Sequence, residues 1–356
     1  MKQLGRLQVL RFVAAFAVLI AHLDHEVVDK LGVEPAFSIR RWIDGGIGVD
    51  MFFFISGFIM YSISARQFGT PGASRMFAER RFLRVAPLYY LATVMMLLAA
   101  HAFAGNVQSH PQGPAQVIAS FLFIPWTNGE GQVTPILKLG WTLNYEAFFY
   151  ACFALALVFP RRLGTALLFA GLVLLIGVAH LFPGRAVALD FWGNDIILEF
   201  LGGICVAMLA RADIRLGKGP AWALVVLGVV LAVTFRQAGL AAMLPRFIFG
   251  GLPAGLVIGA VALAPGLEGK GWLARALQFG GDASYALYLS HPFSIRAATM
   301  LWTRSGLTSP TLFLLFTALC ALAVAAGLHL FVERPLSRVF KREVPPRAAP
   351  DAREMA

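Results

Sequence analysis

An arginine and a histidine stand inside the first long apolar stretch of the chain, where an ionisable side chain is costly and therefore points to a function. Arg11 and His22 are eleven residues apart, and a turn of 100° per residue brings both side chains to one face of a helix. The helical rise separates them by about 16 Å. A substrate with a phosphate at one end and a reactive group on a long arm would bridge that distance. The alternative is that Arg11 extends toward the inner membrane surface and His22 caps the helix near water.

Two carboxylates are predicted at the depth of His22. Asp50 and Glu146 each lie near the start of an apolar segment that enters the membrane from the outer side. A carboxylate that holds the imidazole in one tautomer and stabilises its charged form would make His22 a general base. Taken singly, each carboxylate is also typical of a helix start or an ion pair. The sequence predicts His22, Asp50 and Glu146 as catalytic residues and leaves open which carboxylate supports the histidine.

A group of arginines opens the third apolar segment on the cytoplasmic side. Arg80 and Arg84 share a face at the i, i+4 spacing, with Arg81 beside them. Free N–H groups and the dipole favour phosphate at a helix N-terminus, and arginine binds phosphate in a bidentate manner. The alternative is ordinary anchoring by positive charge on the inner side. We predict that these three residues, with Arg11, bind a phosphorylated donor.

A polar stripe marks the ninth segment. Ser284, Tyr288 and His291 follow the i, i+4, i+7 spacing of one helix face, and Pro292 should kink the helix and free a carbonyl. We predict that the three residues of the stripe contact substrate. A hydrogen-bonded structural histidine at position 291 is the alternative.

Other polar and small residues are given structural roles. Glu199, in the middle of its segment, needs an internal partner or a proton. Glu333 and Arg334 are predicted to form an interfacial ion pair. The sequence contains no Gly-rich phosphate loop with a lysine, no zinc-ligand spacing and no HExxH motif, so no metal site is predicted. Close helix packing is expected at two glycine pairs, Gly202–Gly203 and Gly250–Gly251.

The composition indicates that a membrane must hold these residues in place. Hydrophobic residues make up 58% of the 356 residues and charged residues 14%, with a mean hydropathy of +0.72. A soluble domain would have nearly twice that charged fraction. The net charge of +11 is assigned to Lys and Arg that face anionic lipid on the cytoplasmic side, and nucleic acid is excluded as a partner because no basic stretch lies in a soluble domain.

The apolar runs predict an all-α, polytopic integral membrane protein of about ten transmembrane helices. Lys and Arg concentrate in alternate loops, which places both termini in the cytoplasm. One transmembrane domain is predicted over residues 1–342, followed by a disordered cytoplasmic tail at 343–356. The outer segment 105–140 has an apolar patch, Phe121–Trp126, that is expected to dip back into the membrane. The predicted spans are 7–24, 46–64, 82–104, 141–159, 165–183, 190–209, 220–236, 240–264, 279–302 and 311–332.

The order of these motifs resembles the bacterial acyltransferase type 3 family of integral-membrane O-acyltransferases. The opening of the chain is most similar to that of the exopolysaccharide-production acetyltransferases. The motifs that carry the resemblance are Leu7-Gln8-Val9-Leu10-Arg11 leading to His22, Gly48-Val49-Asp50 with Phe53-Phe54-Ile55-Ser56-Gly57, Arg80-Arg81-x-x-Arg84 with Pro87, Trp141-Thr142-Leu143 with Glu146 and Tyr150, Ser284-Tyr285-x-x-Tyr288-Leu289-x-His291-Pro292, and Glu333-Arg334-Pro335.

The resemblance implies ten core helices in the bacterial inner membrane, an acyl-CoA donor (usually acetyl-CoA) and a hydroxyl of a glycan or lipid-linked glycan as acceptor. It implies that Arg11 and His22 are essential and that the Arg80–Arg84 group helps to hold CoA. No cofactor is expected to be bound permanently. Asn144-Tyr145 departs from the Ser or Thr followed by Val that is more common in the family before the glutamate, and this puts the details of the acceptor in doubt.

Two routes and two other classes of function stay open from the sequence. His22 either removes a proton from the acceptor hydroxyl or attacks the thioester itself to form an acyl-imidazole. Ten helices with intramembrane charges also fit a transporter or flippase of a glycolipid or small solute, although no internal repeat is present. An assembly subunit without chemistry is the third alternative.

Overall fold

The computed structural model is helical throughout the residues that it describes, which are 2–32, 38, 41–102, 113–264 and 271–342. Within these ranges, extended backbone pairs only at an isolated bridge between Thr127 and Val133. The predicted all-α class is confirmed, and the predicted tail 343–356 lies outside the described residues. The helices are α1 (Lys2–Leu31), α2 (Ile47–Ser64), α3 (Ala73–Ala102), α4 (Pro114–Phe121), η2 (Lys138–Gly140), α5 (Trp141–Ala156), α6 (Arg161–Leu181), α7 (Val187–Trp192), η3 (Asp195–Ile197), α8 (Leu198–Arg211), α9 (Lys218–Gln237), η4 (Leu240–Ala242), η5 (Phe247–Gly251), α10 (Leu252–Leu263), α11 (Trp272–Asp282), α12 (Ser284–Ser305), α13 (Pro310–Leu328), η6 (His329–Glu333) and α14 (Arg334–Arg342).

Several of these helices have the length and composition of membrane spans. Four of the ten predicted spans instead contain helices that are shorter or more polar, namely α5, α8, α10 and α12. The protein is therefore membrane-embedded, while ten crossings and cytoplasmic termini stay predictions. Across the described ranges, six helical stretches are long and apolar enough to cross a bilayer: Gly5–Lys30, Ile47–Ser64, Ala73–Ala102, Arg161–Leu181, Lys218–Gln237 and Pro310–Arg338.

Two predicted spans begin with irregular backbone. The segment 190–209 becomes a continuous helix only at Leu198, after the short α7 and the 3₁₀ turn η3. The segment 240–264 begins with the 3₁₀ turn η4 and then the π-helix η5, before α10. The Asp195 carboxylate accepts a hydrogen bond from the Phe247 N–H (2.7 Å), which ties the two irregular segments together. Non-helical backbone at membrane depth is tolerated where it is buried in protein or lines a cavity. We therefore expect polar partners for the backbone groups of these two segments.

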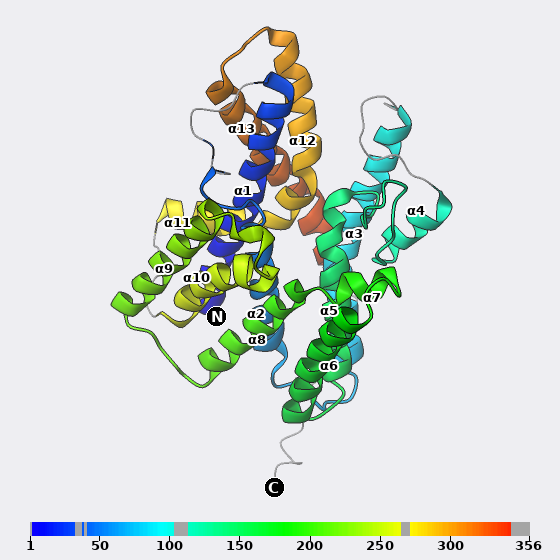
Figure 1. Ribbon diagram of the computed structural model, residues 1–356, viewed down its shortest axis with the longest axis vertical. Helices are drawn as coiled ribbons and strands as arrows, with labels where there is room; N and C mark the ends of the chain where they lie inside the picture. The colour runs from blue at the N-terminus through cyan, green and yellow to red at the C-terminus, as the bar shows by residue number, and fades with distance from the viewer. Residues whose placement is uncertain (1, 33–37, 39–40, 103–112, 265–270, 343–356) are drawn as a thin grey trace.

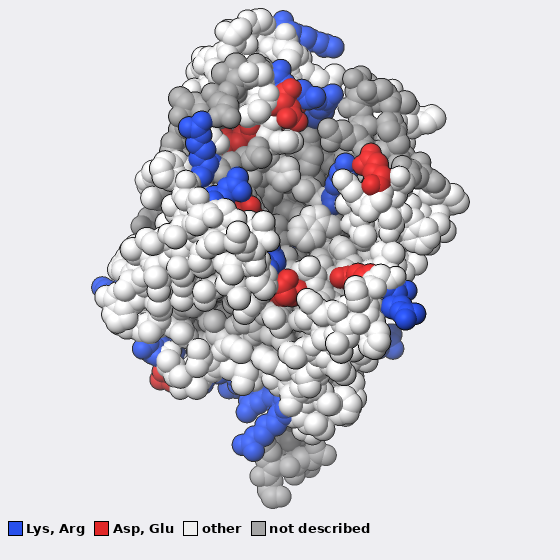
Figure 2. Space-filling model, in the orientation of Figure 1, with Lys and Arg blue, Asp and Glu red and all other residues white. Residues whose placement is uncertain are grey.

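The helices form two groups that diverge toward one end of the molecule (Figure 1). One group contains α1, α12 and α13, which pack on one another. The other contains α3 with α4 beside it, and α5 packs on α3. The crossing of α2 and α8 lies lower in this view, and α2 also packs on α1. Figure 2 shows that the surface is hollowed in the middle of this face, with acidic and basic side chains around the hollow.

Glycines bring α2 and α8 into close contact. A Cβ added to Gly57 would lie 2.0 Å from the carbonyl oxygen of Phe200, and one added to Gly203 would lie 2.0 Å from that of Phe54. The close packing predicted for Gly202–Gly203 is thus confirmed, because either glycine would clash with Phe54 if it had a side chain. This crossing fixes the position of α2, which supplies one wall of the site.

The segment 105–140, which was predicted to lie on the outer side, is described from residue 113 onward, and it packs against the middle of α3. The Tyr89 and Tyr90 hydroxyls donate hydrogen bonds to the carbonyls of Ser120 (3.2 Å) and Phe121 (2.7 Å). Both tyrosines lie near the midpoint of a 30-residue helix. The return of the Phe121–Trp126 patch into the membrane stays a prediction.

Candidate active site

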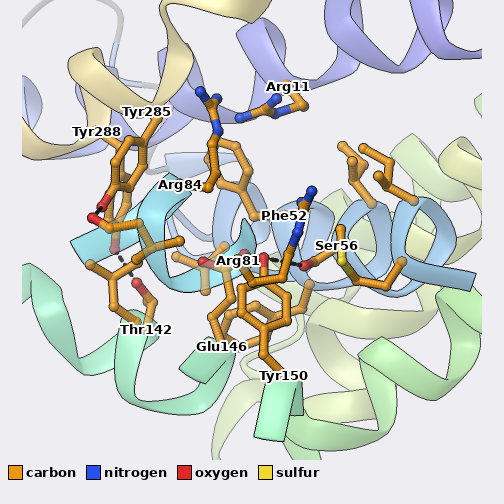
Figure 3. Close-up of a pocket in the computed structure, with 17 residues that line it drawn as sticks. Arg11, Phe52, Ser56, Arg81, Arg84, Thr142, Glu146, Tyr150, Tyr285 and Tyr288 are labelled. Carbon is orange, nitrogen blue, oxygen red and sulfur yellow. Dashed lines mark hydrogen bonds between the residues drawn. The ribbon is translucent and has the colours of Figure 1, made fainter. Parts of the chain in front are cut away.

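A pocket lies between α1, α2, α3, α5 and α12. Its empty volume is about 850 Å³, including the part that opens at its mouth. Apolar side chains of α2 form much of one wall, and polar side chains from all five helices face the interior (Figure 3). The polar lining residues are Arg11, Ser56, Arg81, Arg84, Thr142, Glu146, Tyr150, Tyr285 and Tyr288.

Three arginines make the pocket strongly basic. Arg11 reaches in from α1 close to Arg84, and Arg81 extends toward them from α3 (Figure 3). Because α3 begins at Ala73, these arginines lie inside the helix, and the predicted contribution of free N–H groups at a helix N-terminus is wrong. Arg11 donates a hydrogen bond to Gln8 (3.1 Å), and Arg84 is paired with Glu333 (2.6 Å). The Nε of Arg81 is buried and has no hydrogen-bond partner in the part of the chain that the structure describes. Three guanidinium groups, one of them with a buried and unpaired N–H, favour a ligand with several anionic oxygens.

Arg80 does not line this pocket. It is exposed on α3, whereas Arg81 and Arg84 face the pocket together. The i, i+3 spacing, like i, i+4, brings two side chains to one side of a helix. Either Arg80 or Arg81 can therefore share a face with Arg84. The prediction of four donor-binding arginines is therefore reduced to Arg11, Arg81 and Arg84.

Glu146 faces the arginines from α5. Its carboxylate accepts hydrogen bonds from the hydroxyls of Ser56 (3.1 Å) and of Tyr150, one turn further along the same helix. The Ser56 and Tyr150 hydroxyls are 3.2 Å apart, so the three side chains form one polar cluster on the pocket wall (Figure 3). The structure thus gives Glu146 partners on the pocket wall in place of the predicted contact with His22.

Asp50 points away from α1. Gly48 faces α1, since a Cβ there would lie 2.4 Å from the Ala14 carbonyl, and Asp50 is two residues on, about 200° around the helix. The fully buried Asp50 carboxylate accepts two hydrogen bonds from Arg246, from Nε (2.9 Å) and from Nη2 (2.8 Å). The predicted contact of Asp50 with His22 is replaced by this ion pair, because the two residues lie on different sides of α2.

The neighbours of Asp50 explain a second glycine pair. A Cβ on Gly250 would lie 2.2 Å from the Asp50 carboxylate, and one on Gly251 would lie 3.1 Å from that of Glu199. The pair Gly250–Gly251 in η5 therefore makes room for two carboxylates rather than only for helix packing. Glu199 is fully buried beside Asp50, but neither of its carboxylate oxygens has a hydrogen-bond partner among the described residues, so the predicted alternatives of an internal partner and a bound proton both stay open. Arg246 was not singled out from the sequence, although an arginine within a predicted span was the signal.

His22 lies beside His291. The ring centres are 4.8 Å apart and the rings meet edge to face. The Nδ1 of His22 lies 2.9 Å from the carbonyl oxygen of Val18, and that of His291 lies 3.2 Å from the carbonyl oxygen of Leu287. A carbonyl only accepts, so each Nδ1 has the proton and the basic lone pair is on Nε2. The backbone of α1, one turn back, thus fixes the tautomer that we had assigned to a carboxylate.

Tyr288 connects the two histidines to the pocket. Its ring is 6.1 Å from His291 and 5.9 Å from Phe52, and its hydroxyl contacts the hydroxyl of Thr142 (2.8 Å) and the carbonyl of Leu139 (3.1 Å). Along α12, Tyr285 and Tyr288 line the pocket and His291 follows one turn further. His291 therefore lies next to Tyr288, and His22 contacts His291, but neither histidine is among the residues that line the pocket.

The three residues of the predicted polar stripe on α12 have different surroundings. Tyr288 lines the pocket, and His291 contacts His22. Ser284 is fully buried and donates to the carbonyl of Gly281 (2.7 Å), so it serves the junction between α11 and α12.

Glu333 has a different partner from the one predicted. It binds Arg84 through one oxygen (2.6 Å) and the Nδ1 of His329 through the other (2.7 Å). Arg334, the predicted partner, instead donates from Nε to the Nε2 of His329 (3.0 Å). Successive residues on a helix do not face each other, which excludes the predicted pair and leaves Glu333 to orient a pocket arginine.

Comparisons with known proteins point to one family. A family model described as an acyltransferase domain matches residues 4–330. The exopolysaccharide production protein ExoZ of Rhizobium meliloti (strain 1021) is 35% identical over 308 residues, which cover 83% of this chain and 90% of ExoZ. The acyltransferase MdmB of Streptomyces mycarofaciens is 27% identical over 378 residues, which cover 96% of this chain and 94% of MdmB.

A third relative is longer than this chain. The peptidoglycan O-acetyltransferase OatA of Listeria monocytogenes is 25% identical over 362 residues, which cover 92% of this chain but 55% of OatA. This chain therefore spans about half the length of that relative. No solved structure is significantly similar to the chain.

Proposed function

Because the chain belongs to the acyltransferase type 3 family of membrane enzymes, we propose that it moves an acetyl group from acetyl-CoA to a hydroxyl of an extracellular or surface glycan, or of its lipid-linked precursor. One observation carries the proposal. A pocket with three arginines has Tyr288 on its wall, the Tyr288 ring lies beside His291, and His291 contacts His22, whose tautomer leaves Nε2 basic.

The arginines suit the phosphates of acyl-CoA. Arg11, Arg81 and Arg84 would bind anionic oxygens at the cytoplasmic side, where acyl-CoA is made. Guanidinium groups provide forked donors for such oxygens, and the arm of the donor would then run past Tyr285 and Tyr288. The spacing of Arg11 and His22 on α1 corresponds to about 16 Å, a distance that a long flexible arm covers. The donor is a substrate, and no permanently bound cofactor enters the proposal.

His22 acts as the general base in this proposal. The acceptor hydroxyl gives its proton to His22 Nε2 while its oxygen bonds to the thioester carbonyl carbon. The C–S bond then breaks, and the thiolate takes the proton back from Nε2. General-base assistance contributes roughly 10²–10⁴-fold. If His22 instead attacks the thioester, a labelled acyl-histidine will be trapped after mixing the enzyme with [¹⁴C]acetyl-CoA in the absence of acceptor.

The acceptor class rests on the relatives. ExoZ is named for exopolysaccharide production and OatA for peptidoglycan O-acetylation, which supports a glycan acceptor for this chain. We place the enzyme in the bacterial inner membrane with ten crossings and both termini in the cytoplasm, so that the donor enters from inside and the acceptor from outside.

The test is complementation of a strain from which the gene is deleted. Ester-linked acetyl groups on the exopolysaccharide, measured by mass spectrometry, should disappear on deletion and return with the wild-type gene. His22→Ala, expressed at the same level in the membrane, should restore none. Full restoration by His22→Ala would refute the mechanism. Unchanged acetylation after deletion, together with loss of glycan export, would instead support a transporter.

A further inference from the structure

The ring of His291 is buried against His22 with one polar atom unsatisfied. His291 has no exposed surface, and its Nε2 has no hydrogen-bond partner among the described residues. Its Nδ1 is turned back to the Leu287 carbonyl, so Nε2 has the lone pair. A buried acceptor without a donor is costly, and native proteins keep few of them without a reason.

Among the described residues, the polar groups next to His291 do not donate to its Nε2. Pro292, the next residue, has no N–H. The Tyr288 hydroxyl is engaged with Thr142 and with the Leu139 carbonyl. The Ser294 hydroxyl donates to the Ser290 carbonyl. The polar ring that His291 contacts is that of His22.

We propose that His291 is a positioning residue that stabilises His22 while His22 holds the acceptor proton; this inference rests on the proposed function. With both imidazoles neutral, the lone pair of His291 has no positive group beside it. When the acceptor hydroxyl gives its proton to His22 Nε2, the whole His22 ring becomes a cation next to that lone pair. When Nε2 passes the proton to the departing thiolate, the cation disappears.

An interaction that exists only while His22 is charged lowers the barrier without strengthening substrate binding. Catalysis depends on contacts that are stronger in the transition state than in the ground state. A dipole already fixed in place by the Leu287 carbonyl does not have to reorganise as the charge develops. In this arrangement, the Val18 carbonyl at Nδ1 has the place that an aspartate has beside other catalytic histidines, and His291 adds a second negative dipole beside the ring.

Two substitutions separate the lone pair from the ring. His291→Phe keeps an aromatic ring of similar size and removes the lone pair. His291→Gln keeps an acceptor oxygen on a shorter, non-aromatic side chain. Ser294→Ala, one turn away on α12, removes a local side-chain hydrogen bond and serves as the control for disturbance of the helix.

The assay uses inner-membrane vesicles from the producing strain, which contain the native acceptor, and [¹⁴C]acetyl-CoA as the varied substrate. We expect His291→Phe to lower kcat on the order of 10–100-fold, the usual range for partners that orient a reactive imidazole, with KM for acetyl-CoA within twofold of wild type. His291→Gln should recover most of the loss, and Ser294→Ala should match wild type.

The outcomes separate the inference from the function on which it rests. If wild-type vesicles transfer no acetyl group, the proposed function is refuted, and the inference about His291 is refuted with it. An active wild type with an equally active His291→Phe would overturn the inference alone. Equal losses in the Phe and Gln variants, or a loss confined to KM, would assign His291 to packing or donor binding instead.

Discussion

The adjacent arginines Arg80 and Arg81 of α3 give a matched test of the proposed donor pocket. Arg81 lines the pocket with its Nε buried and unpaired among the described residues, whereas Arg80 is exposed beside it. Replacing either residue by alanine removes one positive charge from the same turn of the same helix. Both variants therefore have the same effect of charge on membrane anchoring. Only Arg81→Ala also removes a hydrogen-bond donor from the pocket.

The magnitude follows from the hydrogen bond that Arg81 would make to a phosphate oxygen. Hydrogen bonds to charged groups contribute about 1.5–3 kcal/mol, and 1.4 kcal/mol is a tenfold change in affinity. Because Arg81 is only partly buried, the lower part of that range applies. We expect Arg81→Ala to weaken acetyl-CoA binding roughly 10–30-fold. Arg80→Ala should change it less than twofold.

Isothermal titration of the purified protein in detergent micelles with acetyl-CoA measures both values. Arg81→Lys should lie between wild type and Arg81→Ala, since an ammonium keeps the charge but loses the forked geometry. Titration with 3′-dephospho-CoA identifies the phosphate that Arg81 binds. If it is the 3′-phosphate, the losses of affinity caused by removing this phosphate and by Arg81→Ala should not be additive. Equal effects of Arg80→Ala and Arg81→Ala would refute the assignment, because they would reduce the arginines to a general surface charge.

Three further variants test other parts of the structure. Asp50→Asn should lower the free energy of unfolding by about 2–4 kcal/mol, because it breaks the ion pair with the partly exposed Arg246; an unchanged melting temperature would contradict this. Gly203→Ala should destabilise by about 1–3 kcal/mol in the same thermal assay, whereas Gly171→Ala, with no atom within 4 Å of the added Cβ, should be neutral within about 1 kcal/mol; equal effects would exclude the close crossing. Tyr288→Phe should slow transfer roughly 3–10-fold in the vesicle assay at saturating acetyl-CoA, because it removes a pocket hydroxyl; a wild-type rate would show that the hydroxyl is dispensable.

The sequence predicted the helices, the membrane and the order of the motifs because apolar length and charge bias are local properties. It also predicted that His22 is chemically important and that Arg11 and Arg84 face a common site. These predictions need only the position of a residue along its helix. The direction of a side chain around the helix, relative to neighbouring helices, is set by packing. Asp50 was therefore predicted at a depth comparable to that of His22 but on the wrong side of α2.

The sequence predicted Arg80 together with Arg81 and Arg84, whereas the structure leaves Arg80 outside the pocket for the same reason. Both spacings to Arg84 are compatible with one helical face, and only the contact of α3 with the rest of the bundle decides which arginine faces the pocket. For Glu146, the sequence predicted a carboxylate near the active site. It did not reveal that Ser56 and Tyr150 would occupy its oxygens.

The partner of Arg84 was beyond any local pattern, because Glu333 lies 249 residues away in the sequence. Glu333 ends the π-helix η6, and its other oxygen is held by His329 at the start of the same π-turn. Both side chains are nearly fully buried, so the carboxylate has little freedom to leave Arg84 for water. A phosphate that binds Arg84 must share this guanidinium with Glu333 or displace it. The π-helix η6 thus sets the orientation and the free charge of Arg84, and this wall of the pocket depends on the contact between Arg84 of α3 and Glu333 of η6.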